Sequence, residues 1–398
     1  MIRNAAVAVC AIASTVLLVP GTARAATGPE RLAAGVTFRT FTTTSAKGPM
    51  VGYLVDVDLR NPHVSVGLLR PPVVAQREQV SAMVTAQHAL AGINGDFFNI
   101  SETHAGVTPT GSSDGPEVAD GRALKGPVPD GQRFGPGLPP GTSTEDVIGV
   151  GSDGVGRLAS LHLAGTVRTG KSTYTLSGLN QYALGVGGIG AFSSAWGTVS
   201  RERAVCGSDL VRADPCSTDT AEVMLRRGVV VSVSDLVGQG AIAPDETVLV
   251  GREGGADTLR AFKVGQRVSV RYRLASDTKK LRFAVGGFPI LRGGAPLAGL
   301  DTKAAAVRTA AGIGGGGHRM YLVVVQPAPG TTGGMTVAEL ATLLTSVGAS
   351  DGVNLDGGGS STLVARDPGA AAATVRNVPT DGTGERPVAN GIGVFAHR

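Results

Sequence analysis

The sequence has few aromatic residues and lacks several well-known catalytic motifs. Aromatic side chains make up 4% of the 398 residues, and only one of them is tryptophan. Proteins that hold single-stranded nucleic acid stack its bases on aromatic side chains, so this composition argues against a nucleic-acid partner. The chain also has no H-E-x-x-H, G-x-S-x-G or P-loop lysine motif, which disfavours the chemistries that these motifs support.

Long apolar runs are missing after the N-terminus. The one such run, residues 5–19, follows Arg3 and precedes the small-x-small pattern Ala23-Arg24-Ala25. This arrangement predicts a secretory signal peptide, residues 1–25, cleaved after Ala25. A membrane span is the weaker interpretation, because the run is short and Pro20 and Gly21 follow it. We therefore expect a secreted, extracellular protein with no membrane span.

Cysteine is rare, and only two cysteines remain once Cys10 leaves with the signal peptide. Cys206 and Cys216 lie close together in a polar stretch, and in an oxidising compartment we expect them to form one local disulfide. A reactive thiol or a metal-binding pair is the alternative. No histidine near them in the sequence suggests zinc, so we predict no metal site.

The charge is low and slightly positive. The formal net charge is +5, and it becomes +3 once the signal peptide takes Arg3 and Arg24 away. This balance favours an anionic cell wall or a polyanionic glycan as surroundings. The 60 glycines show no G-X-Y period and 42% of the residues are hydrophobic, so we expect a loop-rich globular protein with one large domain or two modest ones.

Hydrophobic periodicity predicts both strands and helices. Residues 50–59 alternate as a strand does, and residues 79–90 suit a helix. The best helix is 336–347, where Thr336 and Glu339 have capping-box spacing and Gly348 follows the last turn. Several β-rich runs between residues 197 and 276 predict a β-rich subregion, which we interpret as a possible insertion.

The most informative stretch is residues 354–362, N-L-D-G-G-G-S-S-T. An apolar strand reaches Asp356, and three glycines and three hydroxyl residues follow. Consecutive glycines allow close approach to the backbone, and their N–H groups can form a nest for an anion to which hydroxyls add donors. A carboxylate at the edge of such a nest is a candidate for chemistry. The alternative is a tight turn capped by Asp356.

A second polar stretch, residues 91–99, reads A-G-I-N-G-D-F-F-N. Phe97 and Phe98 are most simply core residues. Three polar residues therefore lie next to a hydrophobic core: Asn94, Asp96 and Asn99. Each needs a hydrogen-bond partner if it is buried. Side chains that only cap a turn are the alternative interpretation.

Five separated stretches together resemble the phosphodiester glycosidase family, which includes the animal lysosomal enzyme that removes N-acetylglucosamine from a mannose 6-phosphate diester. The resemblance covers roughly residues 50–398, so we expect one such domain over 26–398. It implies an α/β (mixed α+β) fold, with a mixed β-sheet and packed helices, and hydrolysis of a sugar-1-phosphodiester. Family members often have a glycine at the position of Asp96, and segment 108–126 is longer than usual; both differences could reshape the substrate pocket, so the substrate of the animal enzyme is not carried over to this chain. The stretches are 94–98, 308–312, 334–336 with its helix, 354–362 and 390–394.

The resemblance and the chemistry assign candidate roles. Arg308 suits a phosphodiester, because a guanidinium can hold two phosphate oxygens, although a surface salt bridge is the alternative. Sugar transfer usually needs two carboxylates, for which Asp356 and Asp96 are the candidates. One carboxylate could suffice, since phosphate leaves readily as an anion. Candidate substrate-binding residues, which could equally stabilise turns, are Asn94, Asn354, Gly357, Gly358, Gly359, Ser360, Ser361, Thr362 and Asn390.

The resulting hypothesis is a secreted hydrolase that cleaves glycosyl phosphodiesters in a phosphate-linked glycan or cell-wall polymer. A non-catalytic glycan-binding or wall-binding protein on the same scaffold is the main alternative, and an ordinary glycosidase on a neutral glycan is a third. We expect no required cofactor. A divalent cation beside Asp356 is conceivable, but no ligand spacing argues for it.

Overall fold

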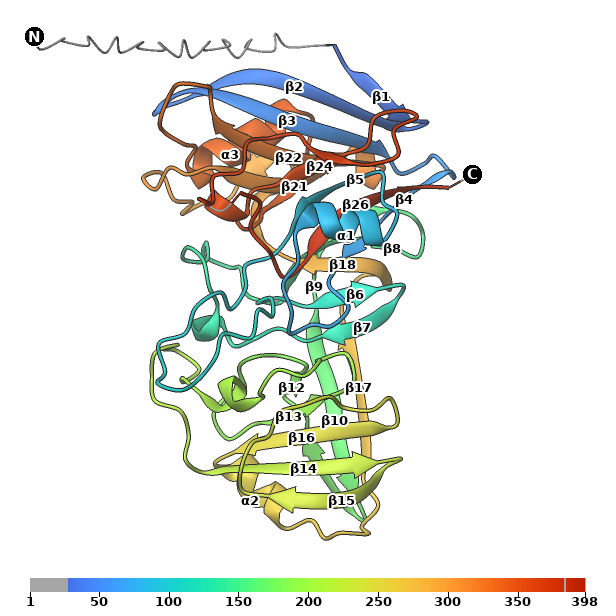
Figure 1. The fold of residues 1–398 in the computed structure, drawn as a ribbon, viewed down its shortest axis with the longest axis vertical. Helices are drawn as coiled ribbons and strands as arrows, with labels where there is room; N and C mark the ends of the chain where they lie inside the picture. The colour runs from blue at the N-terminus through green and yellow to red at the C-terminus, as the bar shows by residue number, and fades with distance from the viewer. Residues whose placement is uncertain (1–27, 383, 398) are drawn as a thin grey trace, which may run out of the picture.

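The computed structural model describes residues 28–382 and 384–397, so the predicted signal peptide lies outside the described residues. The molecule is elongated, with an upper lobe, a middle layer and a lower lobe (Figure 1). The upper lobe contains both ends of the described chain. The lower lobe is formed by the elements from β10 to β17. Within the described residues, no helix has the length and apolar character needed to cross a membrane.

The upper lobe is built on an eight-stranded antiparallel sheet of order β1-β2-β3-β22-β21-β23-β19-β20. β21 and the middle of β22 are buried on both faces, which explains their nearly continuous apolar sequence. The strands are Glu30–Ala33 (β1), Val36–Ser45 (β2), Gly48–Asp58 (β3), Phe288–Arg292 (β19), Ala295–Pro296 (β20), Arg308–Gly314 (β21), Arg319–Pro327 (β22) and Asp351–Asn354 (β23).

Two five-stranded sheets pack against this one. Their orders are β25-β24-β5-β26-β4 and β7-β6-β18-β8-β9, and all three sheets contribute to one core cluster that includes Leu322, Ile392 and Val285. The strands are Val64–Leu69 (β4), Ala91–Asn94 (β5), Glu117–Ala119 (β6), Arg122–Lys125 (β7), Asp146–Gly151 (β8), Gly156–Ser160 (β9), Leu281–Gly286 (β18), Leu363–Ala365 (β24), Thr374–Val375 (β25) and Gly391–Ala396 (β26).

The lower lobe has its own hydrophobic cluster between two sheets, of order β12-β13-β16-β14-β15 and β11-β10-β17. The predicted β-rich subregion, 197–276, lies within this lobe, which also includes β10 to β13. The strands are His162–Thr169 (β10), Ser172–Thr175 (β11), Gly178–Leu179 (β12), Ile189–Phe192 (β13), Thr220–Arg226 (β14), Val229–Ser234 (β15), Glu246–Arg252 (β16) and Ser269–Ala275 (β17).

Helices are short. α3 confirms the predicted helix and its capping box: Glu339 N donates to the Thr336 hydroxyl over 3.2 Å, and Thr336 N donates to Glu339 Oε2 over 2.8 Å. The α-helices are Val80–Ala86 (α1), Gly254–Arg260 (α2) and Val337–Ser346 (α3), and the 3₁₀ turns are Asp130–Gln132, Glu202–Val205, Gly315–Gly317 and Gly358–Ser360.

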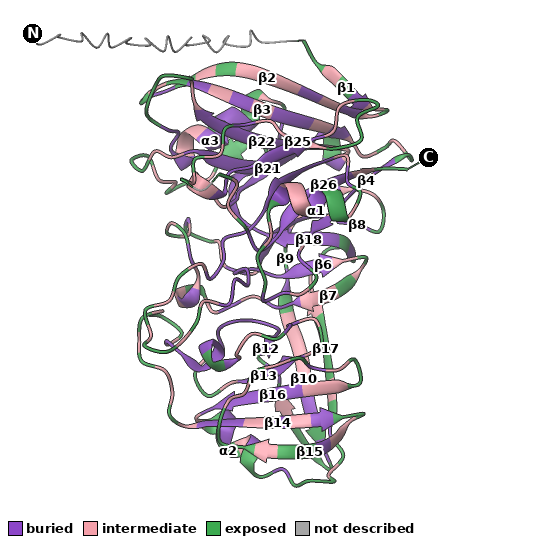
Figure 2. Ribbon diagram, in the orientation of Figure 1, coloured by how far each residue is buried: buried purple, intermediate pink, exposed green. Residues whose placement is uncertain are grey.

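The expected mixed α/β fold is therefore wrong, because the chain is mostly β. Three α-helices of seven, seven and ten residues accompany twenty-six strands in the described part. Only β12 and β13 pair in parallel among the described strands. Antiparallel strands can be joined by short turns, whereas parallel strands need a long crossover that is usually a helix. Only α3 has a helical apolar stripe of useful length, so such crossovers are scarce. Figure 2 shows burial concentrated in the upper strands.

Candidate functional site

Three of the informative stretches meet where strands end. β5 ends at Asn94 and β23 ends at Asn354, while β26 begins at Gly391. Asp356 N donates to Gly95 O over 2.9 Å, and Gly95 N donates to Asn390 O over 2.9 Å. The main chains of these stretches are therefore joined directly, although they lie far apart in the sequence.

Asn94 joins these strand ends through its side chain. Its Nδ2 donates to Asp356 O over 2.7 Å. Its Oδ1 accepts from the Thr309 hydroxyl over 2.8 Å and from Thr362 N over 3.1 Å. The side chain is fully buried, and its bonds to Asp356 O and Thr362 N fix the backbone at both ends of the glycine loop.

Asn390 links the stretch around Asp96 to strand β6 through its side chain. Its Oδ1 accepts from Asp96 N over 2.9 Å, and its Nδ2 donates to Glu117 Oε1 over 2.7 Å. A Cβ on Gly95 would overlap Asn390 Oδ1, which explains the glycine at that position. Asn354, also fully buried, donates to Leu355 O over 3.0 Å, and its Oδ1 has no partner in the described structure.

The loop after Asp356 is held mainly by its own amides. Gly358 N donates to Val307 O over 2.8 Å, Ser360 N to Gly357 O over 3.2 Å and Ser361 N to Gly358 O over 3.1 Å. The side chains of Ser360, Ser361 and Thr362 are buried. The half-exposed part of this stretch is Asp356 with the three glycines.

Arg308 lies on one side of this loop. β21 and β23 pair so that Ala310 is opposite Asn354, which brings Arg308 next to Asp356–Gly357 in the same register. A Cβ on Gly357 would lie 2.7 Å from Val307 O and 3.9 Å from Arg308 Cδ. The buried guanidinium donates through Nε to Met335 O over 2.7 Å and through Nη2 to Ala304 O, and Nη1 bonds to none of the described residues.

A second arginine, which sequence reasoning missed, lies on the other side. A Cβ on Gly359 would overlap the guanidinium of Arg386. Arg386 Nη1 lies 3.4 Å from the Ser360 hydroxyl, and its Nε pairs with Asp381 over 2.5 Å. The glycine loop therefore runs between Arg308 at Gly357 and Arg386 at Gly359. Arg386 stands in a polar loop without periodicity, so no local pattern indicated it.

The carboxyl of Asp356 has a pKa close to neutral pH. Burial raises the pKa of its carboxyl to about 6, and the charge of Asp114 adds to the rise. The Ser360 hydroxyl, the Arg386 guanidinium and the Gly357 amide act in the opposite direction. A carboxyl with such a pKa can exchange a proton near neutral pH, as a general base or acid does.

Asp96 is more deeply buried, at 4% exposure. Its two oxygens accept from Phe97 N over 2.8 Å and from Gly115 N over 2.6 Å, which are the contacts of a turn-capping side chain. Burial and the charge of Asp114 raise its pKa to about 7. A Cβ on Gly286 would overlap Asp96 Oδ2, so a side chain there would displace the carboxylate.

A buried lysine lies beside Asp96 and was also missed. Lys125 Nζ donates to Asp114 O, Gly115 O and Gly126 O over 3.0, 2.9 and 2.8 Å. Burial lowers its pKa to about 8, against the opposing charges of Glu117, Asp96 and Asp114. A lone lysine at the end of a short strand has no sequence signature that separates it from a surface lysine.

Asp114 completes this buried cluster. Its Oδ1 accepts from the Tyr182 hydroxyl over 2.7 Å, its Oδ2 accepts from Phe134 N over 2.8 Å, and Arg133 Nε lies 4.0 Å from Oδ2. A pocket beside Asp96, Asp114 and Arg133 has an accessible volume of about 10 Å³, the space of one water molecule.

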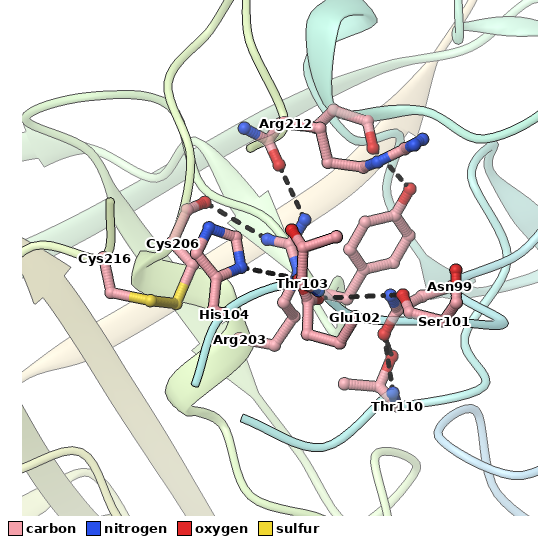
Figure 3. A network of polar contacts seen from close by, with 12 residues as sticks. Asn99, Ser101, Glu102, Thr103, His104, Thr110, Arg203, Cys206, Arg212 and Cys216 are labelled. Carbon is pink, nitrogen blue, oxygen red and sulfur yellow. Dashed lines mark hydrogen bonds and ion pairs between the residues drawn. A yellow bond between two sulfur atoms is a disulfide. The ribbon is translucent and has the colours of Figure 1, made fainter. Parts of the chain in front are cut away.

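The structure contains the expected disulfide between Cys206 and Cys216. Contrary to the sequence-based expectation, a histidine lies beside it: the donor atoms of His104 and both cysteines are all within 4.8 Å of one another. The closed disulfide leaves no thiolate to bind a metal, and His104 bonds to Glu102 over 2.6 Å (Figure 3). Its other ring nitrogen bonds to Asp214 O over 2.7 Å.

The same network clamps the loop after Asn99. Arg203 pairs with Glu102 and donates to Cys206 O over 3.1 Å (Figure 3). It also stacks over the Tyr182 ring. Asn99, one of the polar residues singled out from the sequence, accepts from Thr110 N over 2.6 Å. These contacts hold the loop in place, so the role of Asn99 in this structure is to stabilise the loop.

Comparisons with known proteins give two results. A sequence model of a family matches part of the chain, and solved structures of low sequence identity share its fold. The fold is shared with a hypothetical protein from Synechocystis (TM-score 0.72, 20% identity, 94% of this chain and 64% of that one). It is also shared with a putative exported protein from Burkholderia pseudomallei (TM-score 0.65, 23% identity, 87% of this chain and 74% of that one). This chain thus spans less than two thirds of the Synechocystis structure.

A weaker match is the zebrafish N-acetylglucosamine-1-phosphodiester alpha-N-acetylglucosaminidase catalytic domain, auto-inhibited by its pro-peptide (TM-score 0.43, 15% identity, 92% of this chain and 84% of that one). No curated protein matches the chain. The sequence model of the family described as phosphodiester glycosidase matches residues 219–395, a range that includes Arg308, Asp356, Arg386 and Asn390. This match over residues 219–395 confirms the resemblance to the phosphodiester glycosidase family read from the sequence.

Proposed function

We propose that this protein is a secreted hydrolase that cleaves a glycosyl phosphodiester in a phosphate-linked glycan. The observation that carries the proposal is the partly exposed Asp356, whose pKa is raised to about 6, at the start of a glycine loop that runs between Arg308 and Arg386. A carboxylate on a loop flanked by two cations suits a substrate whose reacting carbon is bonded to an anionic phosphate.

Arg386 is the better candidate for direct phosphate contact. It is half-exposed, and its guanidinium lies at Gly359 and Ser360, where a phosphate could replace solvent. Arg308 donates through two of its nitrogens to the carbonyls of Met335 and Ala304. These bonds fix the guanidinium, and Nη1 remains available to the substrate. A fixed donor loses little conformational entropy when it binds a phosphate.

In the proposed reaction the bond between the anomeric carbon and the phosphate oxygen breaks. The oxygen of a water molecule bonds to the anomeric carbon, and Asp356 takes the proton that this water releases. The phosphate departs as an anion with the bonding electron pair, and the products are a free sugar and a phosphomonoester. Positive charge that develops on the sugar is stabilised by the nearby carboxylates.

Asp96 is the proposed second carboxyl. Because burial and Asp114 raise its pKa to about 7, it carries a proton at mildly acidic pH. The one-water pocket beside it would provide a route for that proton toward the leaving phosphate. Since a phosphate leaves readily without protonation, we assign Asp96 a smaller contribution than Asp356.

Turnover tests the proposal. The purified protein is incubated with a sugar 1-phosphodiester such as UDP-N-acetylglucosamine, and released sugar is measured. Free sugar from the phosphodiester, with none from a neutral glycoside of the same sugar, is the expected result. Binding to wall polymer with no sugar released, unchanged by Asp356→Asn, would instead support the non-catalytic alternative. Equal cleavage of the neutral glycoside would support the ordinary glycosidase.

Replacing Arg386 with alanine should lower kcat/KM by about 10- to 100-fold, because a charge-assisted hydrogen bond to phosphate contributes roughly 1.5–3 kcal/mol. Steady-state kinetics on the phosphodiester measures the change. Arg366→Ala is the matched control, since Arg366 is a neighbouring arginine that bonds the Ala371 carbonyl in an exposed turn. An equal loss in both variants would contradict a specific role for Arg386.

The pH dependence of kcat/KM should be bell-shaped. Activity should rise as pH passes about 6, where Asp356 ionises, and fall as pH passes about 7, where Asp96 loses its proton. Asp96→Asn should remove the descending limb and keep the ascending one. Rates measured from pH 4 to 9 check this, and a descending limb that persists in Asp96→Asn would exclude Asp96 as its source.

A further inference from the structure

The outer sheet of the lower lobe has an unbalanced charge. Its strands β10, β11 and β17, with the turn between β10 and β11, carry the cations Arg168, Lys171, Arg271 and Arg273. The same residues, 162–175 and 269–275, include no aspartate or glutamate. Such a sheet attracts anions and repels cations.

Strand register puts three of these arginines on one face. In the β10–β17 pair, Arg168 is opposite Ser269, Thr166 is opposite Arg271 and Ala164 is opposite Arg273. Directly paired residues share a face of a sheet. The other face carries Val167 and Val270, which pack into the core of the lower lobe. The three exposed arginines therefore point to solvent.

Further cations extend this face at both ends. Arg267 and Arg227 line a pocket together with Arg168 and Arg271. At the opposite end, a second pocket is lined by Arg273 with Arg122, Lys279 and Lys280, and by one carboxylate, Asp277. We call these side chains, on β17 and next to its two ends, the basic strip: Arg122, Arg168, Arg267, Arg271, Arg273 and Lys280.

Little of this charge is neutralised. None of the six side chains of the basic strip forms an ion pair with any residue that the structure describes. The neighbouring Arg227 and Lys279 do, with Asp245 at 3.1 Å and Asp153 at 3.6 Å. Elsewhere in the lower lobe, Arg201, Arg226 and Arg252 each pair with a glutamate, and Arg260 contacts three aspartates. The uncompensated charge is therefore concentrated on the strip.

The shape of the strip favours a linear ligand. Successive same-face positions on a strand lie about 7 Å apart, and the seven residues of β17 extend over about 23 Å. A single phosphate would meet one or two of these cations, whereas a chain of repeating phosphates would meet most of them. A membrane surface fits less well, because the outer face carries threonine, serine and alanine and no large apolar side chain to insert.

We propose that the basic strip binds a linear polyanion with repeating phosphate groups. β10 and β17 run from the lower lobe to the middle layer, so the strip follows the connection between the two ends of the molecule (Figure 1). The proposed binding of a polyanion is argued from charge and geometry alone. That this polyanion is the polymeric substrate, held at a second contact, rests on the proposed function.

Binding of long-chain inorganic polyphosphate tests the strip. Fluorescence anisotropy of labelled polyphosphate is measured with the full chain at several salt concentrations. Arg271→Gln with Arg273→Gln should weaken binding by at least about tenfold and reduce its salt dependence, because fewer counterions are released. The matched control is Arg31→Gln with Lys47→Gln, which removes the same charge from exposed positions of the upper lobe and should change binding less than about twofold.

Two further measurements separate the outcomes. The strip variant should cleave a small sugar phosphodiester as fast as the unchanged protein, since Arg271 and Arg273 are not in the candidate site. If neither protein cleaves it but the strip still binds polyphosphate, the proposed function fails and the strip stands. Equal weakening in the control pair would overturn the strip. Tighter binding to phosphatidylglycerol vesicles or to duplex DNA than to polyphosphate would also overturn it, in favour of a membrane or nucleic acid.

Discussion

Asp356→Asn should lower kcat on a sugar phosphodiester by about 10³-fold, the scale of a lost general acid–base group. Asparagine keeps the size of the side chain and the loop around it, but it cannot take a proton from water. KM should change little, because Arg386 and Arg308 remain in place to bind the phosphate. Steady-state kinetics at pH 6.5, between the two expected pKa values, measures the loss.

The stability of Asp356→Asn separates this from misfolding. The folded protein raises the pKa of Asp356 above the value of an unfolded carboxyl, so this group makes the fold less stable as pH rises from about 4 through 6. Asparagine lacks that penalty. Its free energy of unfolding at pH 7 should therefore equal or exceed that of the unchanged protein.

Asp351→Asn is the matched control for activity. Asp351 begins the same strand, β23, and bonds Gly293 N over 3.1 Å and the Ser350 hydroxyl over 2.8 Å. It should keep nearly full activity. If Asp356→Asn retained more than a tenth of the rate, or if the control lost as much, Asp356 would not be the catalytic carboxylate.

Lys125→Met should destabilise the protein by about 3–5 kcal/mol, the cost of leaving buried charges without their partner. The change removes the donor to three carbonyls and the cation that faces Glu117, Asp96 and Asp114. Urea unfolding followed by circular dichroism measures the loss. Because Lys125 lowers the pKa of Asp96, its removal should also move the descending limb of the pH–rate profile upward.

Two controls test the origin of this effect. Lys303→Met, at an exposed lysine, should change the free energy of unfolding by less than about 0.5 kcal/mol. Adding Glu117→Gln to Lys125→Met should cost less than the sum of the two single changes, because the second removes a charge that the first left uncompensated. Strict additivity would show that charge compensation by Lys125 contributes nothing measurable.

The sequence alone determined the local features of the protein. The N-cap of α3 could be predicted because Thr336 and Glu339 are three residues apart and bond each other within one turn. The Asp356 loop could be singled out because three glycines permit a close backbone path. The disulfide joins cysteines only ten positions apart in the chain, and the resemblance to the phosphodiester glycosidase family followed from the order of short stretches.

Tertiary structure decided the strand arrangement and the partners of the site. Asn94 and Asp356 are 262 positions apart, and Lys125 reaches Asp114 across 11. Arg386 and His104 stand in loops where no period indicates a neighbour. Hydrophobic periodicity reports which face of an element is buried, but not what covers it. The acidic residue was therefore visible in the sequence, whereas the burial that raises its pKa, and the charges of Arg386 and Asp114 that act on it, appeared only when distant loops were brought together.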